Sequence, residues 1–176
     1  ETAPDMMCLS KGLTGGYLPM SVVLTTDRMY DAFYDDYETL RAFLHSHSYT
    51  GNPLGCTAAL ATLSIFENTD VMGNNRRLAQ CMATEVEGLE DHAHVAEIRQ
   101  HGMTLAIEMV QDKAGRTPFP WQERRGLAVY KHALDSGVLL RPMGNVVYFM
   151  PPYVITEEEI RLMARTAIDG IELATR

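Results

Sequence analysis

The stretch LLRPMGNVVYFMPPYVIT, residues 139–156, brings a strand pattern, a turn and a helix start together. Residues 138–141 and 146–150 are apolar and rich in β-branched side chains, so we expect two strands there. The Gly-Asn pair between them favours a hairpin connection. Arg141 then stands at the end of an apolar strand, where its rigid guanidinium suits a carboxylate. An ion pair between domains is the alternative role for this arginine.

Helical patterns flank this hairpin on both sides. Residues 122–136 repeat apolar side chains at helical spacing. A last helix begins at Thr156, and Glu159 completes a capping box. Upstream, residues 95–110 read as two short strands. We therefore expect residues 94–176 to be helices packed on one face of a small, mostly antiparallel sheet.

The N-terminal part is organised around a lysine. Met6–Ser10 is an apolar run that we expect to be a buried strand, and residues 20–26 have the composition of a second strand. Between them, LSKGLTGGYLPMS (residues 9–21) places Lys11 at a strand end, ahead of a glycine-rich turn. A neutral lysine amine held there can attack a carbonyl group. A solvated turn lysine is the alternative interpretation.

A second polar stretch, HSHSYTGNP (residues 45–53), opens a helix that we expect from Pro53 onward. Hydroxyls and backbone N–H groups at a helix start favour anion binding, for instance of a phosphate. Two other interpretations stay open. One is a polar surface loop, and the other is a metal site on His45 and His47 with a third ligand from Asp35, Asp36 or Glu38.

Composition narrows the classes of protein. The formal net charge of −8 argues against a general affinity for nucleic acid or anionic membranes. The apolar runs are far too short to span a bilayer. The three cysteines form no C-x-x-C pair, which favours reduced thiols in a cytoplasmic protein and no zinc site. Because the chain begins without an initiator methionine or a signal-peptide pattern, and a strand follows almost at once, we expect a piece of a longer polypeptide.

Three motifs follow one another along the chain. They are K-x-L-T-G-G at Lys11, Y-T-G-N-P-L-x-C-x-A-A from Tyr49, and R-P-x-G at Arg141 followed by Y-x-M-P-P-Y from Tyr148. This order closely resembles the C-terminal portion of the class III aminotransferases, which are pyridoxal-phosphate enzymes with the α/β fold type I. The resemblance runs from one end of the chain to the other. It implies that residues 1–52 end a large cofactor-binding domain, residues 53–93 are connecting helices, and residues 94–176 form a small α+β domain. It also implies that a large N-terminal part of the enzyme lies outside this chain.

The resemblance assigns roles to residues near the lysine. Lys11 matches the lysine that binds pyridoxal phosphate covalently and later moves a proton between the substrate carbon and the cofactor. Ser48 matches a hydroxyl residue that binds the cofactor phosphate from the neighbouring subunit. Ser46 and His47 replace the Gly-Pro of several relatives and are expected near substrate and phosphate.

The resemblance also implies a reaction. Arg141 matches the arginine that receives the substrate carboxylate, and Tyr148 matches a tyrosine near the keto-acid substrate. Residues 139–156 are most similar to class members of biotin biosynthesis, which implies transamination of 8-amino-7-oxononanoate with S-adenosylmethionine as amino donor, by a cytoplasmic homodimer. The alternatives are another class III enzyme, such as an omega-amino acid:pyruvate aminotransferase, or a catalytically silent fragment. We expect no resident metal and no nucleic-acid or membrane partner.

Overall fold

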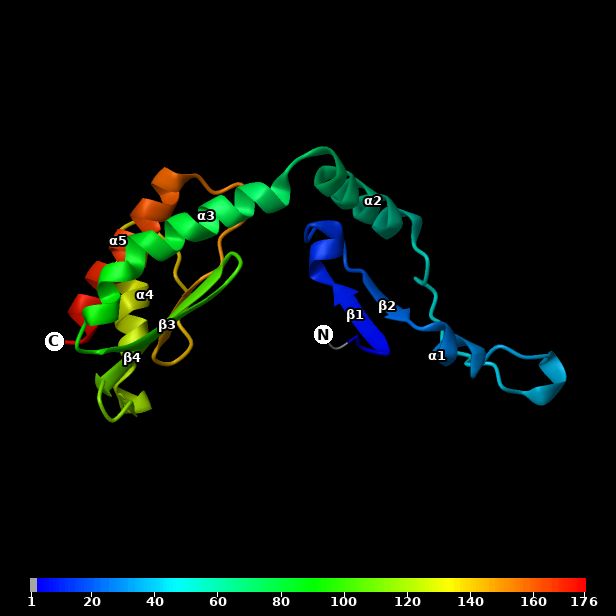
Figure 1. The fold of residues 1–176 in the computed structure, drawn as a ribbon, viewed down its shortest axis with the longest axis horizontal. Helices are drawn as coiled ribbons and strands as arrows, with labels where there is room; N and C mark the ends of the chain where they lie inside the picture. The colour runs from blue at the N-terminus through cyan, green and yellow to red at the C-terminus, as the bar shows by residue number, and fades with distance from the viewer. Residues whose placement is uncertain (1–2) are drawn as a thin grey trace. The chain divides into compact units, whose positions relative to one another are not determined.

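The computed structural model describes residues 3–176. The chain divides into two compact units, residues 1–70 and 71–176, whose elements are drawn in Figure 1. The domain boundaries that we expect after residues 52 and 93 stay a prediction. No helix within residues 3–176 is both long and apolar enough to cross a membrane.

The first unit pairs two strands and carries one long helix. Its sheet is antiparallel and runs from Met6 opposite Thr25 to Ser10 opposite Ser21. Both strands and the helix from Pro53 are confirmed. The elements are β1 (Met6–Ser10), the 3-10 turn η1 (Lys11–Thr14), β2 (Ser21–Thr25), α1 (Asp27–Asp31), the 3-10 turn η2 (Tyr37–Thr39) and α2 (Pro53–Asn68).

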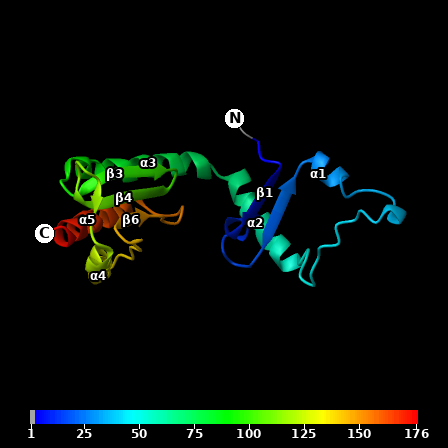
Figure 2. The same cartoon turned by 90° about the horizontal axis from the view of Figure 1, so that it is seen from below.

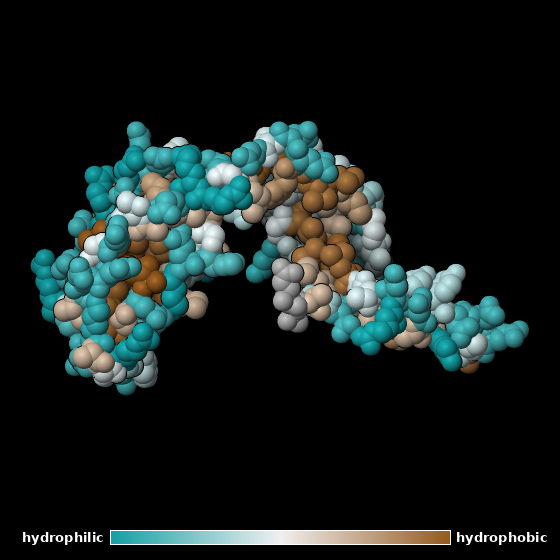
Figure 3. Space-filling view, viewed as in Figure 1, coloured by the Kyte–Doolittle hydropathy of each residue, from teal (hydrophilic) through white to brown (hydrophobic). Residues whose placement is uncertain are grey.

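The expected burial of β1 is wrong. Met6 and Met7 are 56% and 45% exposed, and Val23 and Leu24 of the paired strand are 58% and 50% exposed. Within this unit the sheet has two strands, and α2 packs chiefly against η1, so the faces of the strands are left without a cover. Figure 3 shows apolar side chains gathered on the surface of this unit. Contiguous apolar exposure of this kind is typical of an interface.

The second unit contains an antiparallel sheet and three α-helices among its described residues. β4 is the central strand: it pairs with β3 and with β6 (Figure 2). The end of β4, from Val110 to Asp112, also pairs with the short strand β5. The elements are α3 (Val71–Val86), the 3-10 turn η3 (Glu87–Asp91), β3 (Val95–His101), β4 (Thr104–Asp112), β5 (Thr117–Pro118), the 3-10 turn η4 (Trp121–Glu123), α4 (Arg125–Asp135), β6 (Val146–Phe149) and α5 (Glu157–Ala174).

The core of the second unit lies on one face of this sheet. Leu105, Ile107 and Met109 alternate along β4 and are fully buried. They belong to one apolar cluster with side chains of α3, α4 and α5. The opposite face is polar, because Arg99 of β3 forms ion pairs there with Glu108 and a neighbouring glutamate. Helices on one face of a small antiparallel sheet are therefore confirmed for this part of the chain.

The prediction of a hairpin between residues 138–141 and residues 146–150 is wrong. This segment forms no strand, and β6 pairs with β4 instead. The N–H of Val138 still donates to the carbonyl of Ala133 in α4 at 2.8 Å, and Pro142 has no N–H to donate. The first residue of the segment and the proline that follows it therefore cannot donate to a partner strand, and a single bridge between Met143 and Val146 closes the turn.

Candidate active site

Lys11 follows β1 directly and begins the turn η1. Its φ of 47° lies in the left-handed region, which costs a residue with a Cβ about 1–2 kcal/mol. Backbone strain of this kind persists where surrounding contacts hold it, and it concentrates at functional sites. Lys11, which the sequence motif singles out, is one of four non-glycine residues with a positive φ in the described part of the chain.

Hydrogen bonds within the loop hold this turn. Thr14 is 2% exposed, and its hydroxyl donates to the carbonyl of Leu18 at 2.6 Å and accepts the N–H of the same residue at 3.4 Å. Gly15 has a φ of 60° and donates its N–H to the carbonyl of Gly12 at 3.1 Å. The loop is closed on itself, which keeps Lys11 at the end of the strand.

Helix α2 packs against the same turn. A Cβ added to Gly15 would lie 3.7 Å from Oγ1 of Thr62, and one added to Gly55 would lie 3.8 Å from Sδ of Met20. Asn52 caps the helix with its side chain, and a proline follows at the first helical position. The start of α2 is thereby placed beside the strand end that carries Lys11.

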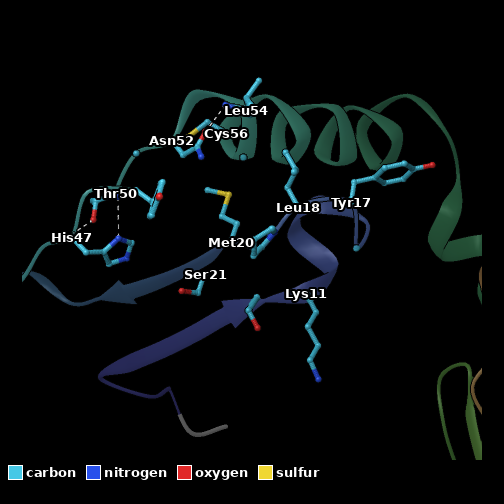
Figure 4. A pocket seen from close by; sticks show the side chains of 16 residues that line it. Lys11, Tyr17, Leu18, Met20, Ser21, His47, Thr50, Asn52, Leu54 and Cys56 are labelled. Carbon is cyan, nitrogen blue, oxygen red and sulfur yellow. Dashed lines mark hydrogen bonds between the residues drawn. The ribbon is translucent and has the colours of Figure 1, made fainter.

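The strand end, the turn and the start of α2 border a hollow of about 1120 Å³. Figure 4 shows Met20 between His47 on one side and Lys11 on the other, with the Lys11 side chain extending away from α2. None of the lining residues is acidic, which favours an anionic ligand. Its polar side chains include Lys11, Ser10, Ser21, His47, Tyr49, Thr50 and Asn52.

His47 is oriented by its own turn. Its N–H donates to Oγ1 of Thr50 at 3.2 Å, and its ring Nδ1 accepts the N–H of Tyr49 at 3.2 Å. Because Nδ1 is the acceptor, the neutral ring carries its proton on Nε2. The ring therefore has a free donor for a ligand.

Ser46 and Ser48 lie in the same exposed segment but do not line the hollow. The role expected for Ser48 concerns a neighbouring subunit, so it stays a prediction. Within residues 3–176, no three His, Cys, Asp or Glu side chains come together to hold a metal ion. His45 and His47 therefore lack the third ligand that a metal site on them requires.

Arg141 and Tyr148 lie in the second unit. Arg141 is exposed and lines a hollow of about 490 Å³ between the start of α4 and the turn that precedes β6. Tyr148 is half-buried on β6, opposite Ala106 of β4, and does not line that hollow. The structure thus brings Lys11 and His47 to one hollow and Arg141 to another.

Two supporting residues escaped the sequence reasoning. Thr14 closes the lysine turn from inside, and nothing in its local sequence distinguishes it from an exposed turn threonine. Gly126 lies in the first turn of α4, where an added Cβ would stand 2.2 Å from the carbonyl oxygen of Gly144. A glycine inside a helical pattern was a signal for such a close approach.

The donor set around Lys11 indicates a ligand type. A primary amine can bond covalently to a carbonyl carbon. Hydroxyls, an imidazole N–H and the start of a helix suit a phosphate or carboxylate. A carbonyl compound that also carries an anionic group suits both the amine and these anion-binding groups.

Comparisons with known proteins agree with this chemistry. The family model described as aminotransferase class III matches residues 1–170. The chain is 44% identical, over 96% of its length, to the adenosylmethionine-8-amino-7-oxononanoate aminotransferase of Geobacter sulfurreducens, and it covers 36% of that relative. The chain thus spans about a third of the length of the curated relatives it matches.

Solved structures give the same picture. The crystal structure of adenosylmethionine-8-amino-7-oxononanoate aminotransferase from Methanocaldococcus jannaschii superposes with a TM-score of 0.93 at 40% identity, over 99% of this chain and 40% of that one. The PMP-bound form of an aminotransferase from Vibrio fluvialis superposes with a TM-score of 0.89 at 28% identity, over 98% and 38% of the two chains. The fold is the α/β fold type I of pyridoxal-phosphate-dependent aminotransferases.

Proposed function

This chain belongs to the class III aminotransferase family, and we propose that it supplies the catalytic lysine of an enzyme that transaminates 8-amino-7-oxononanoate to 7,8-diaminononanoate. The amino donor in this proposal is S-adenosylmethionine, and the pathway is biotin biosynthesis. The observation that carries the proposal is Lys11, which is held in a left-handed conformation at a strand end beside a hollow without acidic residues.

The residues around Lys11 fit pyridoxal phosphate. The amine suits the carbonyl of the cofactor, and the hydroxyls with the Nε2 donor of His47 suit its phosphate, with no carboxylate in the lining to repel it. When bound, the cofactor supplies an electron sink that stabilises negative charge at the reacting substrate carbon. Lys11 and His47 are the residues of this chain that we propose hold it, together with Ser48 from a neighbouring subunit.

Lys11 has two tasks in this proposal. Its Nζ anchors the cofactor before the substrate arrives, and the freed amine then moves a proton at the amine-bearing carbon of the substrate. A fixed strand end suits the second task, because proton transfer requires the donor and acceptor to be within hydrogen-bond reach. The closed loop of Thr14 and Gly15 supports that position.

Arg141 receives the carboxylate of the substrate in this proposal. Its guanidinium has no ion-pair partner among the residues that the structure describes, so it is available to an acid. Tyr148 contacts the keto acid, and Ser46 lies near the substrate. We further propose a cytoplasmic homodimer, in which the exposed apolar faces of β1 and β2 are covered by other parts of the enzyme.

The amino donor is tested with the full-length enzyme. We expect turnover of 8-amino-7-oxononanoate with S-adenosylmethionine and little with alanine or a simple amine. If alanine supports turnover and S-adenosylmethionine does not, the enzyme is another class III aminotransferase, for example one acting on an omega-amino acid and pyruvate. No turnover with any of these donors would count against both enzymes, and chemical labelling then decides whether Lys11 is silent.

The role of Lys11 is tested separately by chemical labelling. Borohydride reduction of the cofactor-loaded full-length protein, followed by peptide mapping, should place a pyridoxyl label on Lys11. The variant Lys11→Ala should lose the label, whereas Lys131→Ala, at an exposed lysine of α4, should keep it. A label on any other residue would refute the assignment.

A further inference from the structure

The hollow beside Arg141 contains a second arginine. Arg124 is the residue that links η4 to α4. Arg124 and Arg141 both line the same hollow of about 490 Å³. None of the residues that line it is acidic. Two cationic side chains in one hollow repel each other unless an anion lies between them.

Neither arginine is neutralised within the described part of the chain. Neither Arg124 nor Arg141 forms an ion pair among residues 3–176. The carboxylate next along the chain, Glu123, is bound by Arg125 at 2.6 Å. Arg125 itself stacks over the ring of Phe119, with 4.1 Å between its guanidinium carbon and the ring centre, so it is committed elsewhere.

The walls of the hollow are apolar. Trp121, Leu127, Tyr130 and Pro142 line it beside the arginines. Trp121 is 78% exposed, an unusual position for an indole unless a ligand or partner covers it. A few charged groups among aromatic and aliphatic side chains are the usual lining of a small-molecule site. The chemistry points to a carboxylate carried on an apolar chain.

The spacing of the two arginines is set by backbone contact. Gly126 lies against the turn after Arg141, where an added Cβ would stand 2.2 Å from the carbonyl oxygen of Gly144 and 2.9 Å from Cβ of Pro142. Arg124 lies two residues before Gly126 and has a φ of 48°, in the left-handed region. The backbone just after Arg124 is therefore packed against the turn that follows Arg141.

We propose that Arg124 is a second carboxylate-recognition residue, which shares the acid group of the substrate with Arg141 while Trp121 and Tyr130 contact the adjoining aliphatic chain. The identification of this acid as the substrate rests on the proposed function. The two-arginine site itself does not depend on turnover. It selects acids with an aliphatic chain over alcohols of the same chain length.

Trp121 provides the measurement, because it is the only tryptophan of the chain and it lines the hollow. Its fluorescence is followed in the full 176-residue chain during titration with nonanoate, acetate and nonan-1-ol. We expect a saturable change with nonanoate, a much weaker response to acetate and none of comparable affinity with nonan-1-ol. Equal affinity for nonan-1-ol and nonanoate would overturn the proposal, since the arginines would then contribute nothing.

Variants assign the effect to Arg124. The change Arg124→Asn removes the cation but keeps a residue type that tolerates the left-handed conformation, and it should weaken nonanoate binding by about tenfold or more. Arg124→Lys should retain part of the affinity. Arg165→Gln, at an exposed arginine of α5 outside the hollow, should bind as the parent does. Unchanged binding by Arg124→Asn, with an unaltered circular dichroism spectrum, would refute the role of Arg124.

The full-length enzyme separates this proposal from the proposed function. There, Arg124→Asn should raise KM for the keto acid and change kcat little, because Arg124 does not touch the reacting carbon. If the enzyme fails to use the keto acid but nonanoate binding keeps its dependence on Arg124, the proposed function fails and the acid site stands. If the keto acid is used and KM is insensitive to Arg124, the acid site fails alone.

Discussion

Gly126 and Gly144 lie so close that a Cβ on the first would stand 2.2 Å from the carbonyl oxygen of the second. Real Cβ atoms do not approach backbone oxygens to this distance, and a backbone carbonyl cannot rotate away as a flexible side chain does. The contact ties the start of α4 to the turn between Arg141 and β6. It therefore sets the separation between the two segments that carry Arg124 and Arg141.

We expect Gly126→Ala to destabilise the second unit by about 1–3 kcal/mol, the usual cost of overpacking a closely packed contact. Urea unfolding followed by circular dichroism measures this. Gly88→Ala is the matched control, because a Cβ there meets nothing within 4 Å, and it should shift the midpoint little. Equal midpoints for both variants would show that the turn moves aside at no cost.

The strained backbone at Lys11 predicts an unusual order of stabilities. Lys11→Gly should be about 1 kcal/mol more stable than Lys11→Ala, because only glycine adopts a φ of 47° freely. Hydrogen exchange of the β1 amides measures the difference locally. At Ser21, in the extended strand β2, the order should reverse, with Ala more stable than Gly. The same order at both positions would contradict the strain at Lys11.

The capping box of α5 predicts a cost for losing Thr156. Its hydroxyl accepts the N–H of Glu159 at 3.2 Å, and the carboxylate of Glu159 accepts the N–H of Thr156 at 2.8 Å. Thr156→Ala should therefore destabilise the second unit by about 1 kcal/mol at neutral pH. Thr156→Ser, which keeps the hydroxyl, should stay close to the parent protein in urea unfolding.

The same cap makes this difference depend on pH. Hydrogen bonds from the backbone and then the hydroxyl of Thr156 hold the pKa of the Glu159 carboxyl below its usual 4.5. A lowered pKa stabilises the fold above the ordinary pKa, and this contribution is lost as the pH falls through the lowered value. The gap between parent and Thr156→Ala should therefore shrink below about pH 4.5. A gap that is constant from pH 7 to pH 3 would contradict this linkage.

Thiol reactivity offers a further measurement. Burial first, and the charge of Glu157 second, raise the pKa of the Cys81 thiol above 9.0. Since the thiolate is the reactive form, a variant that retains only Cys81 should react with a disulfide reagent more slowly at pH 8 than one that retains only the exposed Cys8. Comparable rates would indicate that α3 opens readily around Cys81.

Local elements were predictable where the signal is local. The strand Met6–Ser10 and the helix that begins after Thr156 follow from apolar patterning and cap residues that sit next to each other in sequence. The strand predicted at residues 138–141 does not form, because a local pattern cannot show whether a partner strand is available. Its composition is that of a strand, but Val138 remains bonded to α4, Pro142 lacks an N–H, and β6 pairs with β4 instead.

The candidate site divides in the same way. Lys11 and Arg141 are marked by their motifs, because each stands in a short stretch, K-x-L-T-G-G or R-P-x-G, that can be read from the sequence. Arg124 has no such mark, since it follows Glu123 and precedes Arg125 in a run that suggests a solvated helix start. Its place in an acid-free hollow depends on which neighbour binds that glutamate, and sequence order does not decide this.

The sequence by itself determined the positions of most helices and strands, because these depend on short-range patterns. It also determined the family, and with it the lysine on which the proposed chemistry rests, because three motifs follow one another in a characteristic order along the chain. Only the tertiary structure decided that β1 is exposed in this chain, that Thr14 and Gly126 support the two hollows, and that Arg124 joins Arg141. The roles of Gly126 and Arg124 depend on distances to residues well separated from them in the chain, and that of Thr14 depends on how its own loop closes on Leu18. Such distances follow from packing and backbone clearance, which no single stretch of residues encodes.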